Sequence, residues 1–342
     1  MTIEQIKDKL KSKEYDFLRT DKNLGNNIII LTLGGSHAYG TNNEGSDLDI
    51  RGCALNSKMQ ILTNENFEQF VNNETDTTIY AFNKLVALLS NTNPNTIEML
   101  GNKPEHYFYV SPIGQELIDN AHLFLSKRAC HSFGGYANQQ LYRLNQKAAH
   151  QMSQSELEKH ILKTLEFMQT DFAKKYTPYK DDSMKLYIDK AVQEGYDTEI
   201  FMDVNLHHYP LRDYCSMWNE LQNTVRQYGK IGKRNEKAIE HGKIAKHSMH
   251  LIRLYMMCLD ILEKEKIITY REDEHDLLMD IRNGKYLDSN DQPIPEFFEM
   301  VNDYEKRLDY AKKNTSLPDN PNYKAINEFV ASVNERVVKG EI

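Results

Sequence analysis

Residues 27–52 read NIIILTLGGSHAYGTNNEGSDLDIRG, and this stretch decides the fold class that we predict for the chain. The apolar, β-branched run at 27–33 predicts a buried strand that ends in a tight glycine turn. A second strand is expected over 47–55. A third strand over 75–81 passes directly into an amphipathic helix, because apolar residues between 82 and 89 recur three and four positions apart. Strands and helices thus alternate in the first part of the chain.

The remainder of the chain carries mainly helical signals. Asn93 is expected to cap a helix that begins at Pro94, since asparagine suits the cap and proline the first turn. Long amphipathic stretches predict helices over 130–149, 153–176, 210–229, 236–264, 293–313 and 321–338. Only 267–270 resembles a strand in this part. We therefore expect an α+β fold, with a short mixed sheet in a domain spanning 1–125 and a mainly α-helical domain spanning 126–342.

Composition and charge narrow the class of protein. A chain of 342 residues suggests two domains, and its net charge of −8 argues against a protein that coats nucleic acid indiscriminately. Its four cysteines lack the paired spacing of a zinc site or a disulfide framework. The first residues predict a charged amphipathic helix rather than a signal peptide, and no stretch approaches the roughly 20 apolar residues of a membrane span. We expect a cytoplasmic protein with no membrane partner.

Two short motifs carry the chemistry. A strand that ends in Gly35 and Ser36 before a helix turns backbone N–H groups toward one point, which suits a phosphate. Asp47 and Asp49 share one face of the expected strand because side chains alternate, and such a pair suits a hard cation such as Mg²⁺. Taken alone, the turn can be a simple connection and the acidic pair a solvated strand end. The ten residues between Ser36 and Asp47 allow a short helix and a return, so both motifs can meet at one end of the sheet.

The strings GSHAYGT at 35–41 and SDLDIRG at 46–52 closely resemble the DNA polymerase β superfamily, within it the predicted nucleotidyltransferases of the RNA-ligase-associated branch. The resemblance extends through 93–98 and, more loosely, into 246–254. It implies a polymerase β-like nucleotidyltransferase domain, followed by a helical domain that closes over the nucleotide and acceptor cleft. It also implies transfer of an NMP from an NTP, such as ATP, to an acceptor hydroxyl, with release of pyrophosphate. Two Mg²⁺ ions are implied as cofactors, for which Mn²⁺ can substitute.

The metal ligands that the resemblance implies are Asp47, Asp49 and a third carboxylate on a neighbouring strand. Asp76 is the candidate because it opens the expected third strand, although a surface role is open. Glu74 is the rival because it shares the parity of Asp76 along the chain. His37 is expected to brace the turn, since metal activation of the hydroxyl makes a histidine base unnecessary.

Nucleotide contacts are predicted for a further group of residues, each with an alternative. The group comprises Gly35, Ser36, Tyr39, Thr41, Arg51, Lys246, His250 and Arg253. The tyrosine and threonine either shape the nucleotide pocket or simply pack, and Arg51 either steadies a phosphate or forms a surface salt bridge. The last three line one helix face at spacings of four and three, and they either meet the nucleotide or form an interhelix network. A weaker polar stripe comprises Gly134, Tyr136, Gln140 and Arg143.

An RNA 3′ end is the favoured acceptor. The resemblance leans toward RNA repair, and the segment 226–246 is rich in lysine and arginine, although such a segment can equally be a solvated helix face. A protein side chain or a small molecule such as an aminoglycoside is the alternative acceptor. A catalytically silent NTP-binding interaction module is a different class, against which the intact acidic pair argues. No protein partner is predicted.

Overall fold

The computed structural model describes residues 1–149, 159, 161–162, 165–166, 168–169, 172, 175–192, 198–229, 243–289 and 293–342. These residues belong to two compact units. The first comprises Met1–Gln140, Met249–Tyr286 and Pro295–Ile342, and the second comprises Leu141–Ser248 and Leu287–Ile294. The domain boundary predicted between residues 125 and 126 lies within the first unit, and the division into two functional domains stays a prediction.

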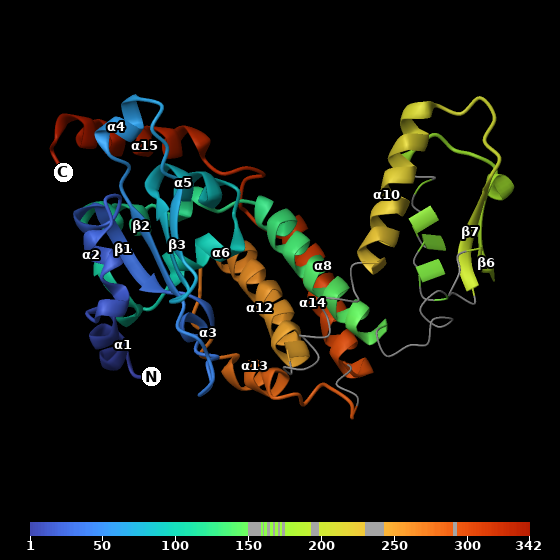
Figure 1. The fold of residues 1–342 in the computed structure, drawn as a ribbon, viewed down its shortest axis with the longest axis horizontal. Coiled ribbons are helices and arrows are strands. Elements are labelled where there is room, and N and C mark those ends of the chain that lie inside the picture. Colours follow the sequence, from blue (N-terminus) through green and yellow to red (C-terminus); the bar gives the residue numbers. More distant parts are fainter. Residues whose placement is uncertain are drawn as a thin grey trace. The chain divides into compact units, whose positions relative to one another are not determined.

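A five-stranded mixed sheet forms the centre of the first unit (Figure 1). Its strands are β1 (Ile28–Leu33), β2 (Ile50–Ala54), β3 (Gln69–Asn72), β4 (Thr77–Ala81) and β5 (Tyr107–Val110). The spatial order is β3-β4-β2-β1-β5. β1 is antiparallel to β2 and β5, β2 and β4 are parallel, and β3 is antiparallel to β4. The predicted α+β class with a short mixed sheet is confirmed.

Helices account for most of the other described residues of the first unit. They are α1 (Ile3–Leu10), α2 (Phe17–Thr20), α3 (Gly35–Tyr39), α4 (Lys58–Leu62), α5 (Phe82–Ser90), α6 (Pro94–Ile97), α7 (Pro112–Asp119), α13 (His275–Arg282), α14 (Pro295–Asn314) and α15 (Tyr323–Lys339). Two longer helices, α8 (Arg128–Ala149) and α12 (Lys243–Lys264), each have residues in both units. None of the helices that the structure describes has the length and apolar composition to cross a membrane.

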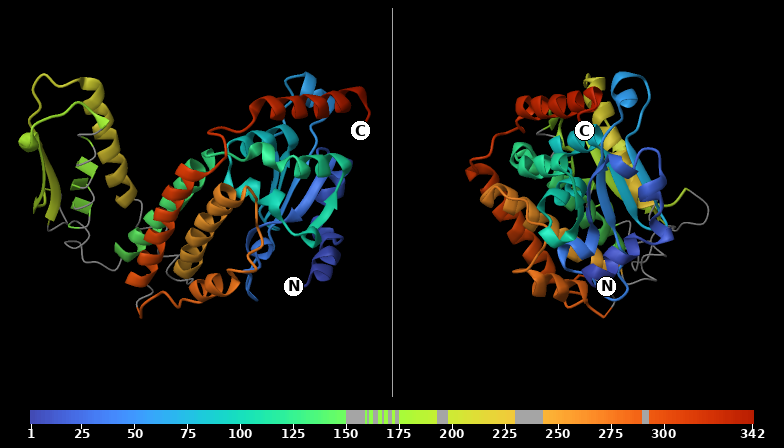
Figure 2. Two further views of the ribbon diagram at one scale, coloured as in Figure 1. Left: turned by 180° about the vertical axis from the view of Figure 1, so that it is seen from behind. Right: turned by 90° about the vertical axis from the view of Figure 1, so that its left-hand side faces the viewer.

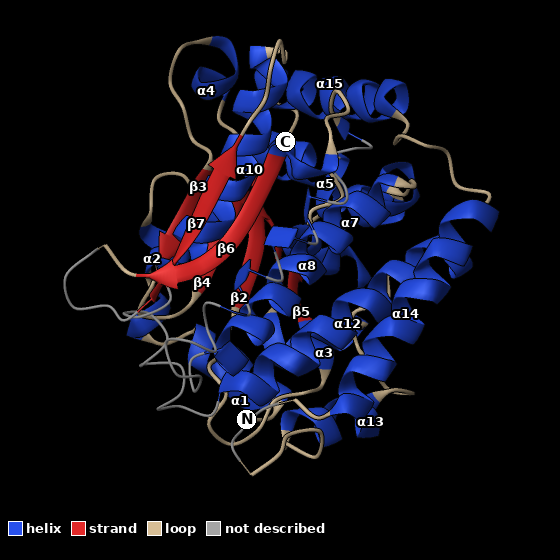
Figure 3. Ribbon diagram, turned by 90° about the vertical axis from the view of Figure 1, so that its right-hand side faces the viewer, coloured by secondary structure: helices blue, strands red, loops and turns tan. Residues whose placement is uncertain are grey.

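Strand β1 is buried along its whole length because side chains from helices pack on both faces of the sheet. Ile28 and Leu31 pack with residues of α1 and α2. Ile29 and Ile30 pack in a second cluster, with residues of α5, α7 and α12 (Figures 1 and 3). Two-sided burial explains why this strand reads as a continuous apolar run. The two chain termini lie on opposite sides of the first unit (Figure 2).

The second unit contains an antiparallel hairpin that the sequence analysis did not predict. Its strands are β6 (Met184–Lys190) and β7 (Thr198–Val204), followed by α10 (Leu211–Gly229). The apolar side chains of Leu186 and Met202 pack against a cluster that includes Met217 of α10. The expectation of helices alone, apart from 267–270, is therefore wrong here. The signal was present, because Met184, Leu186 and Ile188 alternate with polar residues.

The expected strand at 267–270 is also wrong, because this segment pairs with no other strand in the described part of the chain. It runs as irregular chain past the 3₁₀ turn at Glu98–Gly101. Thr269 donates its backbone N–H to the Gly101 carbonyl at 3.1 Å and its hydroxyl to the Glu98 carbonyl at 2.6 Å. Its apolar pattern reflects packing, since Ile267 contacts the core cluster that contains α5 and α12.

The other strands and helices predicted from the sequence agree with the structure, but two strands are shorter than predicted at their first residues. β2 begins at Ile50 and β4 at Thr77, so the expected strands start three and two residues too early. The helices predicted at 130–149, 210–229, 293–313 and 321–338 correspond to α8, α10, α14 and α15. The helix predicted at 153–176 and the first residues of 236–264 lie largely outside the described residues.

Candidate active site

The turn after β1 lies directly against the acidic segment before β2. The Gly34 N–H donates to the Asp49 carbonyl at 2.9 Å, which extends the β1–β2 ladder beyond the strands. Gly35 has a φ of +57°, and a Cβ atom there would lie 2.6 Å from Cγ of Asp49. Glycine is therefore required both by the backbone conformation and by the closeness of the carboxylate. The two motifs, ten residues apart in sequence, are in contact.

Helix α3 is held in place at its end and along its buried side. Gly40 ends it in the left-handed conformation, and the Thr41 N–H donates to the Ser36 carbonyl at 2.9 Å. His37 is buried, which lowers its pKa, and its ring hydrogen-bonds the backbone of Ser46 in the loop before Asp47. This contact agrees with the expectation that His37 braces the turn. Ser36 is half-buried and remains at the surface of the turn.

Asp49 and Asp76 occupy corresponding positions on two neighbouring strands. β2 and β4 are parallel with Ile50 opposite Thr77, and each aspartate directly precedes one of this pair. The Asp76 carbonyl accepts the Ile50 N–H at 3.2 Å. Asp76 has a φ of +46°, rare for a residue with a side chain, and its side chain is exposed. The two side chains therefore begin from the same end of the sheet.

Arg51 joins these two positions. Its Nη2 atom lies 3.0 Å from Oδ1 of Asp49, and its Nη1 donates to the Asp76 carbonyl at 2.7 Å. Arg51 thus forms a salt bridge with Asp49, and a salt bridge was one of the two roles predicted for it. Asp47 is exposed two residues before Asp49, whereas Glu74 lies in the turn between β3 and β4. The register of β2 and β4 favours Asp76 over Glu74 as the nearer partner of Asp49.

The carboxylates at this end of the sheet are suitable ligands for magnesium, although the structure does not bring them together into a complete metal site. Among the described residues, no group of three or more His, Cys, Asp or Glu side chains is close enough to hold a metal ion. Asp47, Asp49 and Asp76 nevertheless supply carboxylate oxygens, which Mg²⁺ prefers, and the missing side chain of Gly35 allows the Asp49 carboxylate to lie against the turn. Arg51 is already paired with Asp49, so metal binding there requires Arg51 to exchange that contact for another anion.

A buried polar network supports α3 from the helical side. The Arg253 guanidinium carbon lies 3.4 Å from the centroid of the Tyr39 ring, and the arginine is only 4% exposed. Arg253 also lies 3.6 Å from Oε2 of Glu98 and 2.6 Å from Nδ1 of His250. Burial lowers the pKa of Arg253 and raises the pKa of Glu98, because it disfavours the charged form of each group.

Other predicted site residues have different surroundings. Thr41 is completely buried, and its hydroxyl has no hydrogen-bond partner among the residues that the structure describes. Lys246 is exposed on α12 and belongs to the second compact unit, whereas His250 and Arg253 belong to the first. Of the polar stripe on α8, Tyr136 accepts a hydrogen bond from Nδ2 of Asn93 at 3.4 Å. The side chains of Gln140 and Arg143, and residues 230–242 of the basic segment, lie outside the described residues.

Two residues that touch α3 were not predicted from the sequence. The Tyr270 ring packs where a Cβ of Gly40 would stand, and the Arg271 N–H donates to the Tyr39 carbonyl at 3.1 Å. The Arg271 side chain is buried and pairs with Asp260 at 2.5 Å. No spacing rule connects these residues with α3, because they lie far along the chain. The position of Arg271 directly after the apolar segment 267–270 was the only feature of the sequence that could have suggested a role for it.

Replacing Gly35 with alanine is expected to destabilise the protein by about 2 kcal/mol, because alanine is strained at positive φ and its methyl group displaces Asp49. The nucleotidyl transfer that the sequence analysis predicts should fall at least about tenfold, since the displaced carboxylate is a predicted metal ligand. Denaturant unfolding and transfer rates measure both effects. Gly45→Ala is the matched control, because a Cβ there meets only a side-chain atom 4.0 Å away. Equal behaviour of the two variants would refute the close packing at Gly35.

Comparison with known proteins identifies a family that covers most of the chain. The family model described as RNA repair pathway DNA polymerase beta family matches residues 6–332. Neither the curated proteins nor the solved structures contain a significant match to the chain.

Proposed function

Because the chain belongs to the RNA repair pathway DNA polymerase beta family, which implies a polymerase β-like nucleotidyltransferase, we propose that it transfers an NMP from an NTP to an RNA 3′ hydroxyl. The observation that carries this proposal is the contact between the Gly35 turn and Asp49. A phosphate-binding turn beside a metal-binding carboxylate is what transfer from a metal-bound triphosphate requires. The RNA repair assignment of the family favours RNA over a protein or a small molecule as acceptor.

The reaction forms one P–O bond and breaks another. The 3′ oxygen of the acceptor attacks the α-phosphorus of the NTP, the bond to the bridging oxygen breaks, and pyrophosphate leaves with those electrons. The hydroxyl proton passes to solvent. Two Mg²⁺ ions, when bound, would lower the pKa of the attacking hydroxyl and neutralise charge on the triphosphate. Asp47 and Asp49 would hold both ions, with Asp76 as the third ligand.

The remaining residues position the substrate. Backbone N–H groups of Gly35 and Ser36 orient the triphosphate at the start of α3. Arg51 releases Asp49 and contacts a phosphate instead, a change available to a salt bridge that is partly open to solvent. Tyr39 and Thr41, both buried, hold the shape of α3. His250 is proposed to contact the nucleotide, whereas Arg253 supports Tyr39 by packing on the face of its ring.

The test is incubation of the purified protein with each α-labelled NTP, Mg²⁺ and a single-stranded RNA. We expect label on RNA that ends in a 3′ hydroxyl and none on the same RNA ending in a 3′ phosphate. A chelator should abolish the label, because without Mg²⁺ the aspartate carboxylates repel the negatively charged triphosphate. Label on protein or on a small molecule would contradict the acceptor, and nucleotide binding without any transfer would indicate a silent module.

A further inference from the structure

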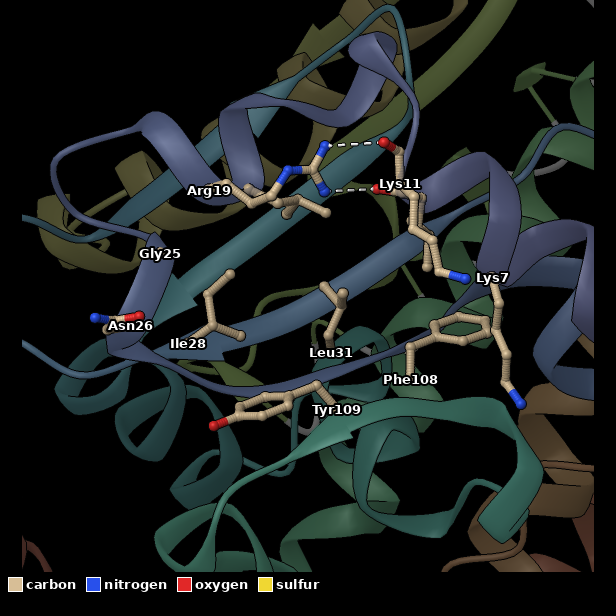
Figure 4. Close-up of a pocket in the computed structure, with 11 residues that line it drawn as sticks. Lys7, Lys11, Arg19, Gly25, Asn26, Ile28, Leu31, Phe108 and Tyr109 are labelled. Atoms are coloured by element: carbon tan, nitrogen blue, oxygen red, sulfur yellow. Dashed lines mark hydrogen bonds between the residues drawn. The ribbon is translucent and has the colours of Figure 1, made fainter.

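A cavity of about 460 Å³ opens on the first unit between α1, α2 and the strands β1 and β5. Its apolar residues include Ile28 and Leu31 of β1 and the aromatic pair Phe108 and Tyr109 of β5. Figure 4 shows the side chains of Ile28 and Leu31 in the middle of the cavity, with the rings of Phe108 and Tyr109 along one wall. Tyr109 is 51% exposed, a large exposure for an aromatic residue on an edge strand. The cavity thus presents open aromatic surface.

The charged side chains that line this cavity are cations. They are Lys7, Lys11 and Arg19, and none of the other described residues that line it is acidic. Each of the three cations has a carboxylate partner outside the lining, namely Glu4, Asp8 and Asp16. A ligand that combines negative charge with a flat or apolar part fits such a cavity. A nucleotide, with its phosphate and its base, has this combination.

Two of the three cations are available to such a ligand. Arg19 donates to the carbonyls of Leu10 and Ser12 at 3.0 and 3.1 Å, so it holds the end of α1 and shapes the wall. Lys7 and Lys11 have only exposed helical ion pairs, with Glu4 and Asp8. Such pairs contribute little and exchange readily for a phosphate. In Figure 4 both lysines lie on the side of the cavity where Phe108 stands.

The cavity lies close to the candidate active site. Its residues Ile28 and Leu31 belong to the same buried cluster as Ala38 of α3 and Leu48, which separates the two proposed metal ligands. Leu31 and Gly34 are three residues apart along β1 and its end, a distance of about 10 Å.

We propose that this cavity binds a nucleotide unit of the single-stranded RNA acceptor, upstream of its 3′ end. Lys7 and Lys11 contact the phosphate, and Tyr109 with Phe108 stacks on the base. Aromatic surface beside cations is the usual means of binding single strands without reading their sequence. The proposal rests on the RNA acceptor of the proposed function, and it gives that acceptor a second point of attachment away from the carboxylates.

The experiment measures binding of a fluorescent 12-nucleotide single-stranded RNA to the full chain by anisotropy, with chelator and without NTP. The double variant Lys7→Gln/Lys11→Gln should bind about tenfold more weakly than the wild type. The slope of log affinity against log salt should become less steep by about 0.7, because the contact with one phosphate is lost and each phosphate contributes about 0.7 on single strands. Tyr109→Ala should weaken binding about tenfold without changing the salt slope.

The matched control is Lys13→Gln/Lys22→Gln, which removes the same charge from exposed lysines of the first unit that do not line the cavity. It should bind RNA like the wild type, and circular dichroism should show all variants folded. Equal RNA affinity of the two double variants overturns the proposal. So does competition by free AMP at the same nucleotide concentration, which would indicate a mononucleotide site.

Failure of this proposal and failure of the proposed function give different results. RNA binding that depends on Lys7 and Lys11, together with no label on RNA in the transfer assay, supports the cavity and contradicts the acceptor. Label on RNA with unchanged affinity of the lysine variant contradicts the cavity alone.

Discussion

Asp49→Asn is expected to slow nucleotidyl transfer by about a thousandfold or more while leaving the protein folded. A neutral amide cannot hold Mg²⁺ as a carboxylate does, and metal ions contribute several kcal/mol to stabilising the transition state. Each 1.36 kcal/mol corresponds to about a tenfold change in rate. Asparagine keeps the shape that packs against Gly35 and still accepts a hydrogen bond from Arg51, so the thermal midpoint should change little.

The measurement is the initial rate of label transfer to RNA at saturating NTP and Mg²⁺, beside the thermal midpoint. Glu44→Gln provides the matched control, because it removes one exposed carboxylate from the loop that leads to Asp47. That variant should retain the wild-type rate. Turnover of Asp49→Asn within tenfold of the wild type would remove the two-metal assignment, whatever the acceptor.

Arg253→Met is expected to lower the free energy of unfolding by about 3–5 kcal/mol, because it leaves Glu98 buried without its cation. It also removes the guanidinium from the Tyr39 ring, an interaction worth about 2 kcal/mol when desolvated. Losing this support should loosen α3 and lower the transfer rate. The double variant Arg253→Met/Glu98→Met removes both charges and should recover a large part of the stability.

Chemical denaturation of the single and double variants measures the coupling between the two charges. Arg307→Met is the control, since Arg307 makes a more exposed ion pair with Glu263 and its loss should cost at most about 1 kcal/mol. If Arg253→Met unfolds at the same denaturant concentration as Arg307→Met, the buried pair does not support α3. A double variant less stable than the single one would assign the loss to packing rather than to charge.

Much of the N-terminal fold was predictable because its signals are local. The apolar run at 27–33 became β1, Asn93 caps α6 and its side chain accepts the Asn95 N–H at 3.0 Å, and the long amphipathic helices largely appear where their periodicity places them. The hairpin of β6 and β7 was not predicted, although apolar and polar residues alternate in β6. The segments on both sides have helical periodicity, and the whole region was therefore predicted to be helical. Local pattern fails where two periods compete over a short stretch.

The candidate site divides in the same way. The spacing of the two motifs allowed the Gly35 turn to meet Asp49, and in the structure the two are in contact. Asp76 was preferred to Glu74 because it opens the expected third strand, although both share the same parity. The parallel pairing of β2 and β4 adds a second reason for Asp76, because it sets Thr77 opposite Ile50.

The sequence by itself determined the first strand, the glycine turn and the acidic segment, because each depends on residues next to one another in the chain. Tertiary structure alone decided that Arg253 lies on Tyr39 and pairs with Glu98, and that Arg271 reaches Asp260 and the end of α3. Those contacts join segments far apart in sequence. Whether an arginine meets solvent, a phosphate or a buried carboxylate depends on which faces pack together, and no local pattern encodes that choice.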